Sequence, residues 1–335
     1  MVKQLKAVNP LTIKEKYMTV GIIGHYRCGD HDMGEHHPEN GKRLTAISDQ
    51  LIRSGLDYVV RQFNAKPIDK SLISLAHTQE HIDFVFDNAP NQDEENFAVG
   101  EDSVMNSKTL TSILLSAGAA IDGVDLVMDK TLSSAFCATR PPGHHAEHNK
   151  GMGFCFFNNI AIAAAYAREK YKLKRVAIVD FDVHHGNGTE DIVKNYFPNV
   201  DNTSDGAYLF CSSYQFPFYP FDIKESNTPP IINTPLAATT KGPDFRKAIS
   251  EHWLPALNKF KPEMIFISAG FDAHIEDDMS QVSLTEADYR WVTDELKKIA
   301  QEHAEGRIVS VLEGGYNLSA LGRSVVAHIN GLIGN

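Results

Sequence analysis

Cysteine is scarce in this chain. Four cysteines (Cys28, Cys137, Cys155 and Cys211) are spread over 335 residues, and no two of them form a CxxC pair. This spacing excludes zinc-ribbon and thioredoxin-like redox motifs, which need closely paired thiols. Three of the four lie in apolar, strand-like segments, so we expect buried structural thiols in a reducing compartment.

Blocks of basic residues and long apolar runs are also missing. Lysine and arginine total 32 against 43 acidic residues, and the resulting net charge of −11 argues against nucleic acid as a partner. The apolar run Ile160–Ala167 is far shorter than the roughly 20 residues that cross a membrane, so no membrane partner is expected. The N-terminus is basic, but no apolar segment follows it; we therefore expect no signal peptide and a cytoplasmic protein.

Short apolar runs alternate with longer helical patterns along the chain. Strands are predicted at 58–61, 132–138, 175–180, 207–211, 263–268 and 307–312. Helices are predicted at 41–53, 78–88, 108–128, 158–171, 244–259, 285–303 and 318–332. This alternation predicts an α/β fold with a central, mostly parallel sheet and helices on both faces. The proline-containing stretch 217–235 is predicted to be a surface loop within it.

Polar clusters follow four of the predicted strands. RPPGHH comes after strand 132–138, DFDVHH ends strand 175–180, GFDAH comes after strand 263–268, and EGGY comes after strand 307–312. Ligand sites in open parallel sheets lie at the carboxyl ends of the strands. We therefore expect these four segments to converge on one edge of the sheet.

The segments DFDVHH and GFDAH contain side chains of the types that bind metals. Asp180, Asp182 and His184 alternate along a strand end, so they share one face. Carboxylate and imidazole groups at this spacing suit a divalent metal with nitrogen and oxygen ligands. Asp272 alone would more often be a helix N-cap, but its place at the same edge favours a third ligand. Zn²⁺, Fe²⁺ and Co²⁺ all suit this oxygen-rich set.

Two further clusters offer acid, base and oxyanion-stabilising groups. The prolines and glycine of RPPGHH would present His144 and His145 rigidly, and paired imidazoles can supply a general base and a general acid. The glycines before Tyr316 would let its phenol reach inward to stabilise an oxyanion. Each motif alone is also compatible with a purely structural role. The aromatic segments 153–159 and 216–220 suggest the walls of a narrow channel for an extended aliphatic arm.

Together these motifs resemble the histone deacetylase and acetylpolyamine amidohydrolase superfamily, which has an arginase-like α/β fold. The order RPPGHHA, GFCFFNN, DFDVHHGNG, GFDAH, LEGGYNL is highly specific, and MGEHHPENGKR (33–43) fits the family's early segment. The residues of these motifs resemble those of class II and bacterial members more than those of class I members. The resemblance extends from about His25 to Leu332. It implies one catalytic domain over 18–335, preceded by an N-terminal extension over 1–17.

The resemblance also implies roles for the matching residues. Asp182, His184 and Asp272 match the zinc ligands. His144 matches the histidine that accepts a proton from water, and His145 the histidine that helps protonate the departing amine.

Further residues also match positions with known roles in the family. Asp180 matches the buried carboxylate that orients His144, and Tyr316 matches the tyrosine that polarises the substrate carbonyl. A structural potassium ion is expected at a site formed by Asp180, Asp182, His184, Ser212 and Ser213. The substrate channel is expected to involve Gly153, Phe154, Tyr219, Met279, Asp102 and Ser103.

Several channel positions depart from the family pattern. Tyr219 stands where many relatives have phenylalanine, so its hydroxyl could hydrogen-bond and alter the channel. Met279 stands where polyamine-specific relatives carry a glutamate, which weakens the polyamine interpretation. Asp102 and Ser103 resemble a loop that contacts the substrate backbone, although a simple helix-entry turn is an equal alternative.

The sequence therefore predicts a metal-dependent deacetylase acting on N-acetyl-lysine in proteins or peptides. Two alternatives stay open: hydrolysis of acetylpolyamines or other small N-acetyl amines, and a silent module that binds acyl-lysine without turnover. The sequence also leaves open a homo-oligomer.

Overall fold

The computed structural model describes residues 19–92, 95–197, 207–221, 223 and 226–334. The predicted N-terminal extension, 1–17, lies outside the described residues.

A single large sheet forms the centre of the described chain, as predicted. Its nine described strands have the order β2-β1-β5-β11-β10-β6-β7-β9-β8, and all neighbours are parallel except the pair β8 and β9. The strands are β1 (Val20–Gly24), β2 (Arg61–Asn64), β5 (Ser134–Cys137), β6 (Val176–Asp180), β7 (Tyr208–Gln215), β8 (Asn227–Thr228), β9 (Ile231–Leu236), β10 (Met264–Ala269) and β11 (Ile308–Leu312). A short antiparallel pair, β3 (Phe97–Ala98) and β4 (Val104–Met105), lies apart from it.

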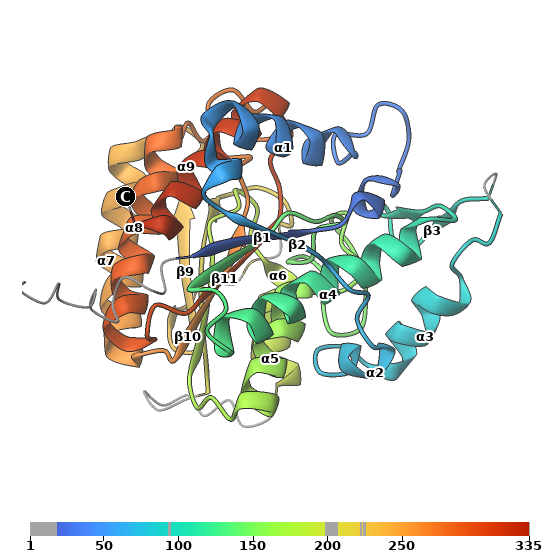
Figure 1. Ribbon diagram of the computed structural model, residues 1–335, viewed down its shortest axis with the longest axis horizontal. Helices are drawn as coiled ribbons and strands as arrows, with labels where there is room; N and C mark the ends of the chain where they lie inside the picture. Colours follow the sequence, from blue (N-terminus) through green and yellow to red (C-terminus); the bar gives the residue numbers. More distant parts are fainter. Residues whose placement is uncertain (1–18, 93–94, 198–206, 222, 224–225, 335) are drawn as a thin grey trace, which may run out of the picture.

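Helices cover both faces of this sheet (Figure 1). The helices are α1 (Lys42–Ser54), α2 (Lys70–Ile73), α3 (Gln79–Asp87), α4 (Thr109–Met128), α5 (Asn159–Tyr171), α6 (Asn187–Asp191), α7 (Gly242–Phe260), α8 (Glu286–His303) and α9 (Leu318–Ile333). Short 3₁₀ segments occupy Tyr26–Gly29 and Leu56–Tyr58, and a π-helical turn occupies Ile192–Tyr196. The seven predicted helices start and end within two residues of α1, α3, α4, α5, α7, α8 and α9.

Successive side chains of each strand point to opposite faces of the sheet, and this creates two hydrophobic cores, one on each face. Ile178 of β6 packs with the α4 and α5 side, and its neighbour Val179 packs with the side of α1, α7, α8 and α9. Strands β5, β6, β10 and β11 are buried on both faces and are mostly apolar along their length, as expected for a parallel sheet under two helical layers. All four cysteines are buried and none forms a disulfide, which confirms their prediction as buried thiols.

Two predictions about the edges of the sheet were wrong. The segment predicted as strand 58–61 contains a 3₁₀ turn, and the strand β2 begins at Arg61, because Tyr58 is 91% exposed and carries no partner strand. The stretch 217–235 is not all loop, since β8 and most of β9 lie in it. Pro235 fits in β9 because β8 pairs with Ile231 and Ile232 only, so the missing N–H at Pro235 costs no bond on that side.

Helix α4 is long and apolar enough to cross a membrane by length and composition. However, 67% of its most apolar window is buried inside the protein, and the core helix of a globular protein passes the same test.

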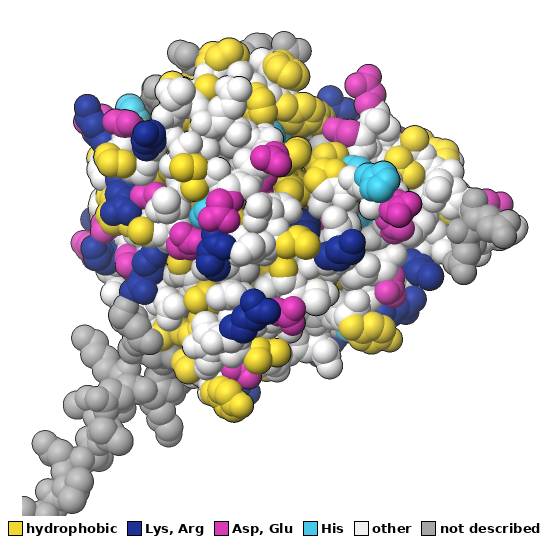
Figure 2. Space-filling view, turned by 90° about the horizontal axis from the view of Figure 1, so that it is seen from above, with side chains coloured by type: hydrophobic (Ala, Val, Ile, Leu, Met, Phe, Trp, Pro, Cys, Tyr) yellow, Lys and Arg dark blue, Asp and Glu magenta, His cyan; other side chains and the backbone are white. Residues whose placement is uncertain are grey.

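On the face seen in Figure 2, basic and acidic side chains are interspersed.

Candidate active site

The four polar clusters meet at the carboxyl edge of the sheet, as predicted. His144 and His145 follow β5, Asp182 and His184 follow β6, and Asp272 follows β10. Tyr316 follows β11 and lines the same cavity as His145 and His184. Because β5, β11, β10 and β6 are consecutive neighbours in the sheet, their ends place these side chains within contact distance.

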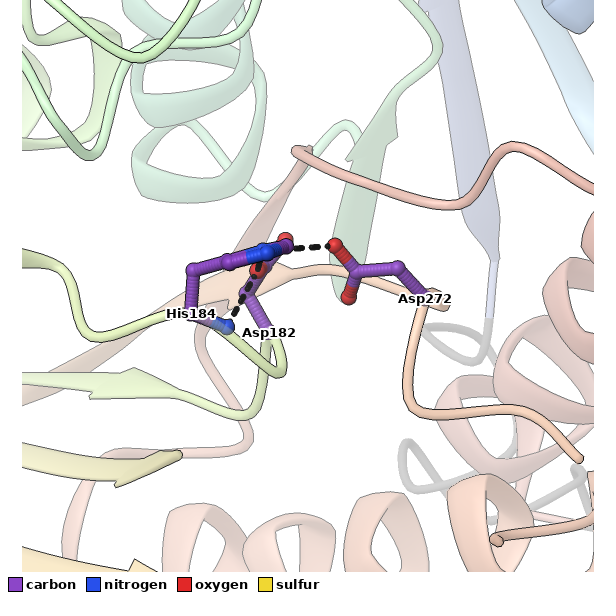
Figure 3. A group of neighbouring side chains, drawn as sticks. All are labelled: Asp182, His184 and Asp272. Carbon is purple, nitrogen blue, oxygen red and sulfur yellow. Dashed lines mark hydrogen bonds and ion pairs between the residues drawn. The ribbon is translucent and has the colours of Figure 1, made fainter. Parts of the chain in front are cut away.

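Asp182, His184 and Asp272 form a buried group with the composition of a metal site (Figure 3). One ligand atom from each lies within 4.8 Å of the others. His184 Nδ1 is 3.1 Å from Asp182 Oδ1 and 3.1 Å from Asp272 Oδ2. Within the described residues, this is the one group of three or more such side chains found close enough to hold a metal.

The backbone around these carboxylates is shaped to hold them. A Cβ at Gly270 would lie 2.0 Å from Asp182 Oδ2, and a Cβ at Gly314 would lie 2.2 Å from Asp272 Oδ2. Gly314 N–H donates to Asp182 Oδ2 at 2.8 Å. The glycines therefore let the chain close around two buried carboxylates, each of which places one oxygen against the imidazole of His184. A divalent cation with nitrogen and oxygen ligands fits this cradle.

Burial and neighbouring charges shift the pKa values of this group. Burial, followed by the charge of Asp182, raises the pKa of Asp272 to about 6. Burial alone would lower the pKa of His184, but its hydrogen bonds to Asp182 and Asp272 raise it to about 10.

The two adjacent histidines have different partners. His144 Nδ1 lies 2.9 Å from Asp180 Oδ2, whereas His145 Nδ1 lies 2.7 Å from the amide oxygen of Asn187. Burial lowers the pKa of His144, but Asp180, Asp182 and Glu313 outweigh it and raise the pKa to about 10. Burial and the charges of His144 and His184 hold the pKa of His145 well below its usual range. The pKa values of the two adjacent imidazoles are therefore shifted in opposite directions.

Sequence reasoning missed Asn187 and Glu313 as partners of the histidine loop. Asn187 begins α6, directly after the predicted DFDVHHG segment, so its proximity to His185 in sequence was the available signal. Glu313 is fully buried and accepts hydrogen bonds from Gly143 N–H at 2.7 Å and His144 N–H at 3.2 Å. It opens the predicted EGGY motif, whose glycines and tyrosine drew the functional interpretation instead.

A cavity of about 340 Å³ opens from this group to the surface. Its lining includes the predicted channel residues Asp102, Gly153, Phe154, Tyr219, Met279 and Tyr316, and also Phe218 and Phe221. Ser103 is fully buried and supports the lining from behind, where its hydroxyl accepts a hydrogen bond from Phe154 N–H at 3.0 Å. Asp102 and Ser103 precede α4 and accept hydrogen bonds from the backbone N–H groups of Gly153 and Phe154, so they contact the channel loop.

The residues predicted to hold potassium lie on neighbouring strand ends. Asp180 of β6 is paired in register with Ser212 of β7. The Ser212 hydroxyl lies 3.0 Å from His185 Nδ1. The Ser213 hydroxyl is buried and has no hydrogen-bond partner among the described residues.

Comparison with known proteins gives consistent matches. Residues 37–332 match the model of the histone deacetylase domain. The chain is 34% identical over 309 residues to a probable deacetylase of Archaeoglobus fulgidus, covering 90% of this chain and 82% of that protein. It is 33% identical over 339 residues to the chloroplastic histone deacetylase 14 of Arabidopsis thaliana, covering 95% and 76% of the two chains.

Two further similarities bear on substrate and fold. The human polyamine deacetylase HDAC10 is 32% identical over 313 residues, which cover 89% of this chain and 45% of that protein. The crystal structure of the HDA15 HD domain superposes with a TM-score of 0.84 at 30% identity, covering 95% of this chain and 89% of that chain.

Metal affinity should depend steeply on pH. A metal can bind His184 only after its raised pKa has been overcome and the imidazole proton is lost. Zn²⁺ affinity should therefore rise about tenfold per pH unit between about pH 7 and pH 9. Competition with a chromophoric chelator at pH 7, 8 and 9 measures this slope. In Asp272→Asn, affinity should fall and the slope should flatten; affinity independent of pH in the unaltered protein would contradict the assignment.

Proposed function

The chain belongs to the histone deacetylase family, and we propose that it is a zinc-dependent enzyme that hydrolyses N-acetyl-lysine in proteins or peptides. The observation that carries this proposal is the buried group Asp182, His184 and Asp272 beside a cavity that His145 and Tyr316 also line. This arrangement brings candidate metal ligands, an acid–base group and an oxyanion donor to one end of a channel.

The shape of the channel supports an unbranched alkyl arm as its occupant. Phe154 and Tyr219 face it from different loops, and Met279 adds an apolar side chain. Such walls suit the methylene chain of lysine, with the acetamide at the inner end. A second candidate is a small N-acetyl amine, because Asp278 is exposed beside Met279 and could attract a second amine.

The metal-site geometry supports a single divalent ion. Asp182, His184 and Asp272 would hold Zn²⁺, which when bound supplies Lewis acidity toward the acetyl oxygen and toward water. Fe²⁺ and Co²⁺ suit the same residues. We also propose a structural K⁺ held near Asp180, Asp182, His184, Ser212 and Ser213. The buried Ser213 hydroxyl, which lacks a partner among the described residues, supports this second ion.

The hydrogen-bond partners of His144 and His145 support different catalytic roles for the two side chains. Asn187 Oδ1 occupies the Nδ1 side of His145, which leaves the Nε2 lone pair of a neutral imidazole to accept a proton from water. The same Nε2 can then return that proton to the departing amine. His144, paired with Asp180, keeps its positive charge beside the reacting group. This assignment gives His145 the base role that the family resemblance implied for His144.

Tyr316 is placed to donate a hydrogen bond within the cavity. Burial and the charge of Asp272 hold the pKa of its phenol well above the usual value, so the proton stays on the oxygen. Its backbone N–H donates to Asp277 at 2.6 Å, and the guanidinium of Arg43 lies 5.0 Å from its ring centre. These contacts fix the turn that presents the phenol to a developing oxyanion.

The direct test compares substrates on the zinc-loaded enzyme. We expect kcat/KM for an acetyl-lysine peptide to exceed that for N-acetylputrescine and N-acetylspermidine, because Met279 supplies no carboxylate for their second amine. His144→Ala should abolish peptide turnover. Preference for the polyamines would establish the second candidate instead, and binding of the peptide without turnover would establish a silent acyl-lysine module.

Removing one oxygen from Tyr316 tests its role. Tyr316→Phe should lower kcat by about 10²–10³, equivalent to about 2.7–4 kcal/mol, as for loss of one oxyanion donor. Steady-state kinetics with the acetyl-lysine peptide measures this. A loss below tenfold would remove Tyr316 from the oxyanion site.

A carboxylate in place of the Asn187 amide tests the assignment of the base. Asn187→Asp should raise the pKa of His145, because a nearby negative charge favours the imidazolium. The acidic limb of the pH profile of kcat/KM should then move to higher pH, since more of the base is protonated at a given pH. Asn195→Asp, at an exposed position on the following turn, is the matched control and should leave the profile in place. An unmoved acidic limb in Asn187→Asp would argue for another base.

A further inference from the structure

One carboxylate holds both walls of the channel. Asp102 Oδ1 accepts a hydrogen bond from Gly153 N–H at 2.9 Å, and Asp102 Oδ2 accepts one from the phenol of Tyr219 at 3.1 Å. Gly153 and Tyr219 belong to loops far apart in sequence, after β5 and after β7. Asp102 lies on a third segment, between β3 and β4. Three separate segments are therefore joined at the mouth of the channel.

The wall formed by Gly153 and Phe154 depends on this anchoring. Both residues have left-handed backbones, with φ of 59° and 67°, and such a turn is costly for Phe154 unless its surroundings hold it. The backbone N–H of Gly153 donates to Asp102, and the backbone N–H of Phe154 donates to Ser103, so both donors are satisfied. A Cβ at Gly153 would lie 2.3 Å from His145 Cδ2, so the turn presses directly on His145.

The opposite wall is fixed by the phenol of Tyr219. Its ring stands edge-on to His145, with centroids 5.2 Å apart and an interplanar angle of 86°. Burial and the charge of Asp102 raise the pKa of Tyr219, so the phenol keeps the proton that it donates. A phenylalanine here would keep the ring against His145 but lose the bond across the mouth.

We infer that Tyr219 is a specificity-determining residue, and that its hydrogen bond to Asp102 fixes the separation of the two channel walls. With the bond in place, the mouth admits an unbranched alkyl arm and resists a wider one. Without it, the loop that carries Tyr219 and the 70%-exposed Phe221 can move outward. The inference rests on the proposed function, because acetamide hydrolysis is the reaction through which the selection is measured.

Two peptides of the same sequence test whether the channel selects by the width of the substrate's arm, because both carry the same reacting acetamide. One carries N-ε-acetyl-lysine, and the other carries 4-(acetamidomethyl)phenylalanine at the same position. Both present an acetamide on a CH₂ group, but the second arm contains a ring. The readout is the ratio of kcat/KM for the linear arm to kcat/KM for the ring arm, which a general loss of activity does not change.

The variants are Tyr219→Phe and, as a matched control, Tyr166→Phe. Tyr166 also donates to an aspartate, with its phenol 3.0 and 3.2 Å from the two oxygens of Asp125, but it lies on α5 and does not line the channel. Tyr219→Phe should lower the ratio about fivefold, the scale of one hydrogen bond, and Tyr166→Phe should change it less than twofold. An unchanged ratio in Tyr219→Phe would overturn the inference.

A second measurement separates this inference from the proposed function. Amide hydrogen exchange of the segment 151–157, followed by mass spectrometry, should be faster in Tyr219→Phe than in Tyr166→Phe, and equal rates would count against the bond across the mouth. If the unaltered enzyme hydrolyses neither peptide, the proposed function fails. The ratio of the two peptides' dissociation constants then replaces kcat/KM, with the same fivefold change expected and an unchanged ratio again overturning the inference.

Discussion

The buried charges of Glu39, Arg43 and Arg140 are the interaction on which the geometry of the site depends. All three side chains are fully buried. Burial alone would raise the pKa of Glu39, but Arg140 and Arg43 lower it to about 2. Breaking such a group by removing one member leaves an unpaired charge in the interior, which typically costs 3–5 kcal/mol. The three positions are therefore held tightly relative to one another.

This group joins segments that each carry part of the site. Arg140 precedes the two histidines and donates to the carbonyls of Cys28 and His31. Arg43, in the first turn of α1, donates to the carbonyls of Glu313 and Gly315, which precede Tyr316. The histidine loop and the tyrosine turn are thus fixed against the same carboxylate, while Glu313 links them a second time through Gly143 and His144. Rigid support of this kind is what a preorganised active site requires.

The sequence predicted the parts of the fold whose signals are local. The seven longer helices were placed well because apolar spacing and capping residues define them, as the capping box of Thr285 and Asp288 shows at α8. Strand β9 was missed because prolines surround it, and its assignment depends on pairing with β7, which no local pattern reports. The candidate metal ligands Asp182 and His184 could be proposed from the sequence because they lie two residues apart, and the structure brings them together with Asp272. Asn187, Glu313 and Arg43 act through partners that the fold brings close, so their contacts were not visible in the sequence.

The bonds from Arg43 to the turn before Tyr316 also bear on how the protein is made. The carbonyl of Gly315 that Arg43 contacts lies 272 residues further along the chain. During synthesis, Arg43 of α1 must therefore wait until the segment that carries Gly315 has left the ribosome before it finds these acceptors. Contacts of such long range slow folding and leave unfinished surfaces exposed meanwhile. A nascent chain that stops before β11 would hold the candidate metal ligands but lack the turn that closes around them, so the site is completed only after β11 and the turn that follows it have been made.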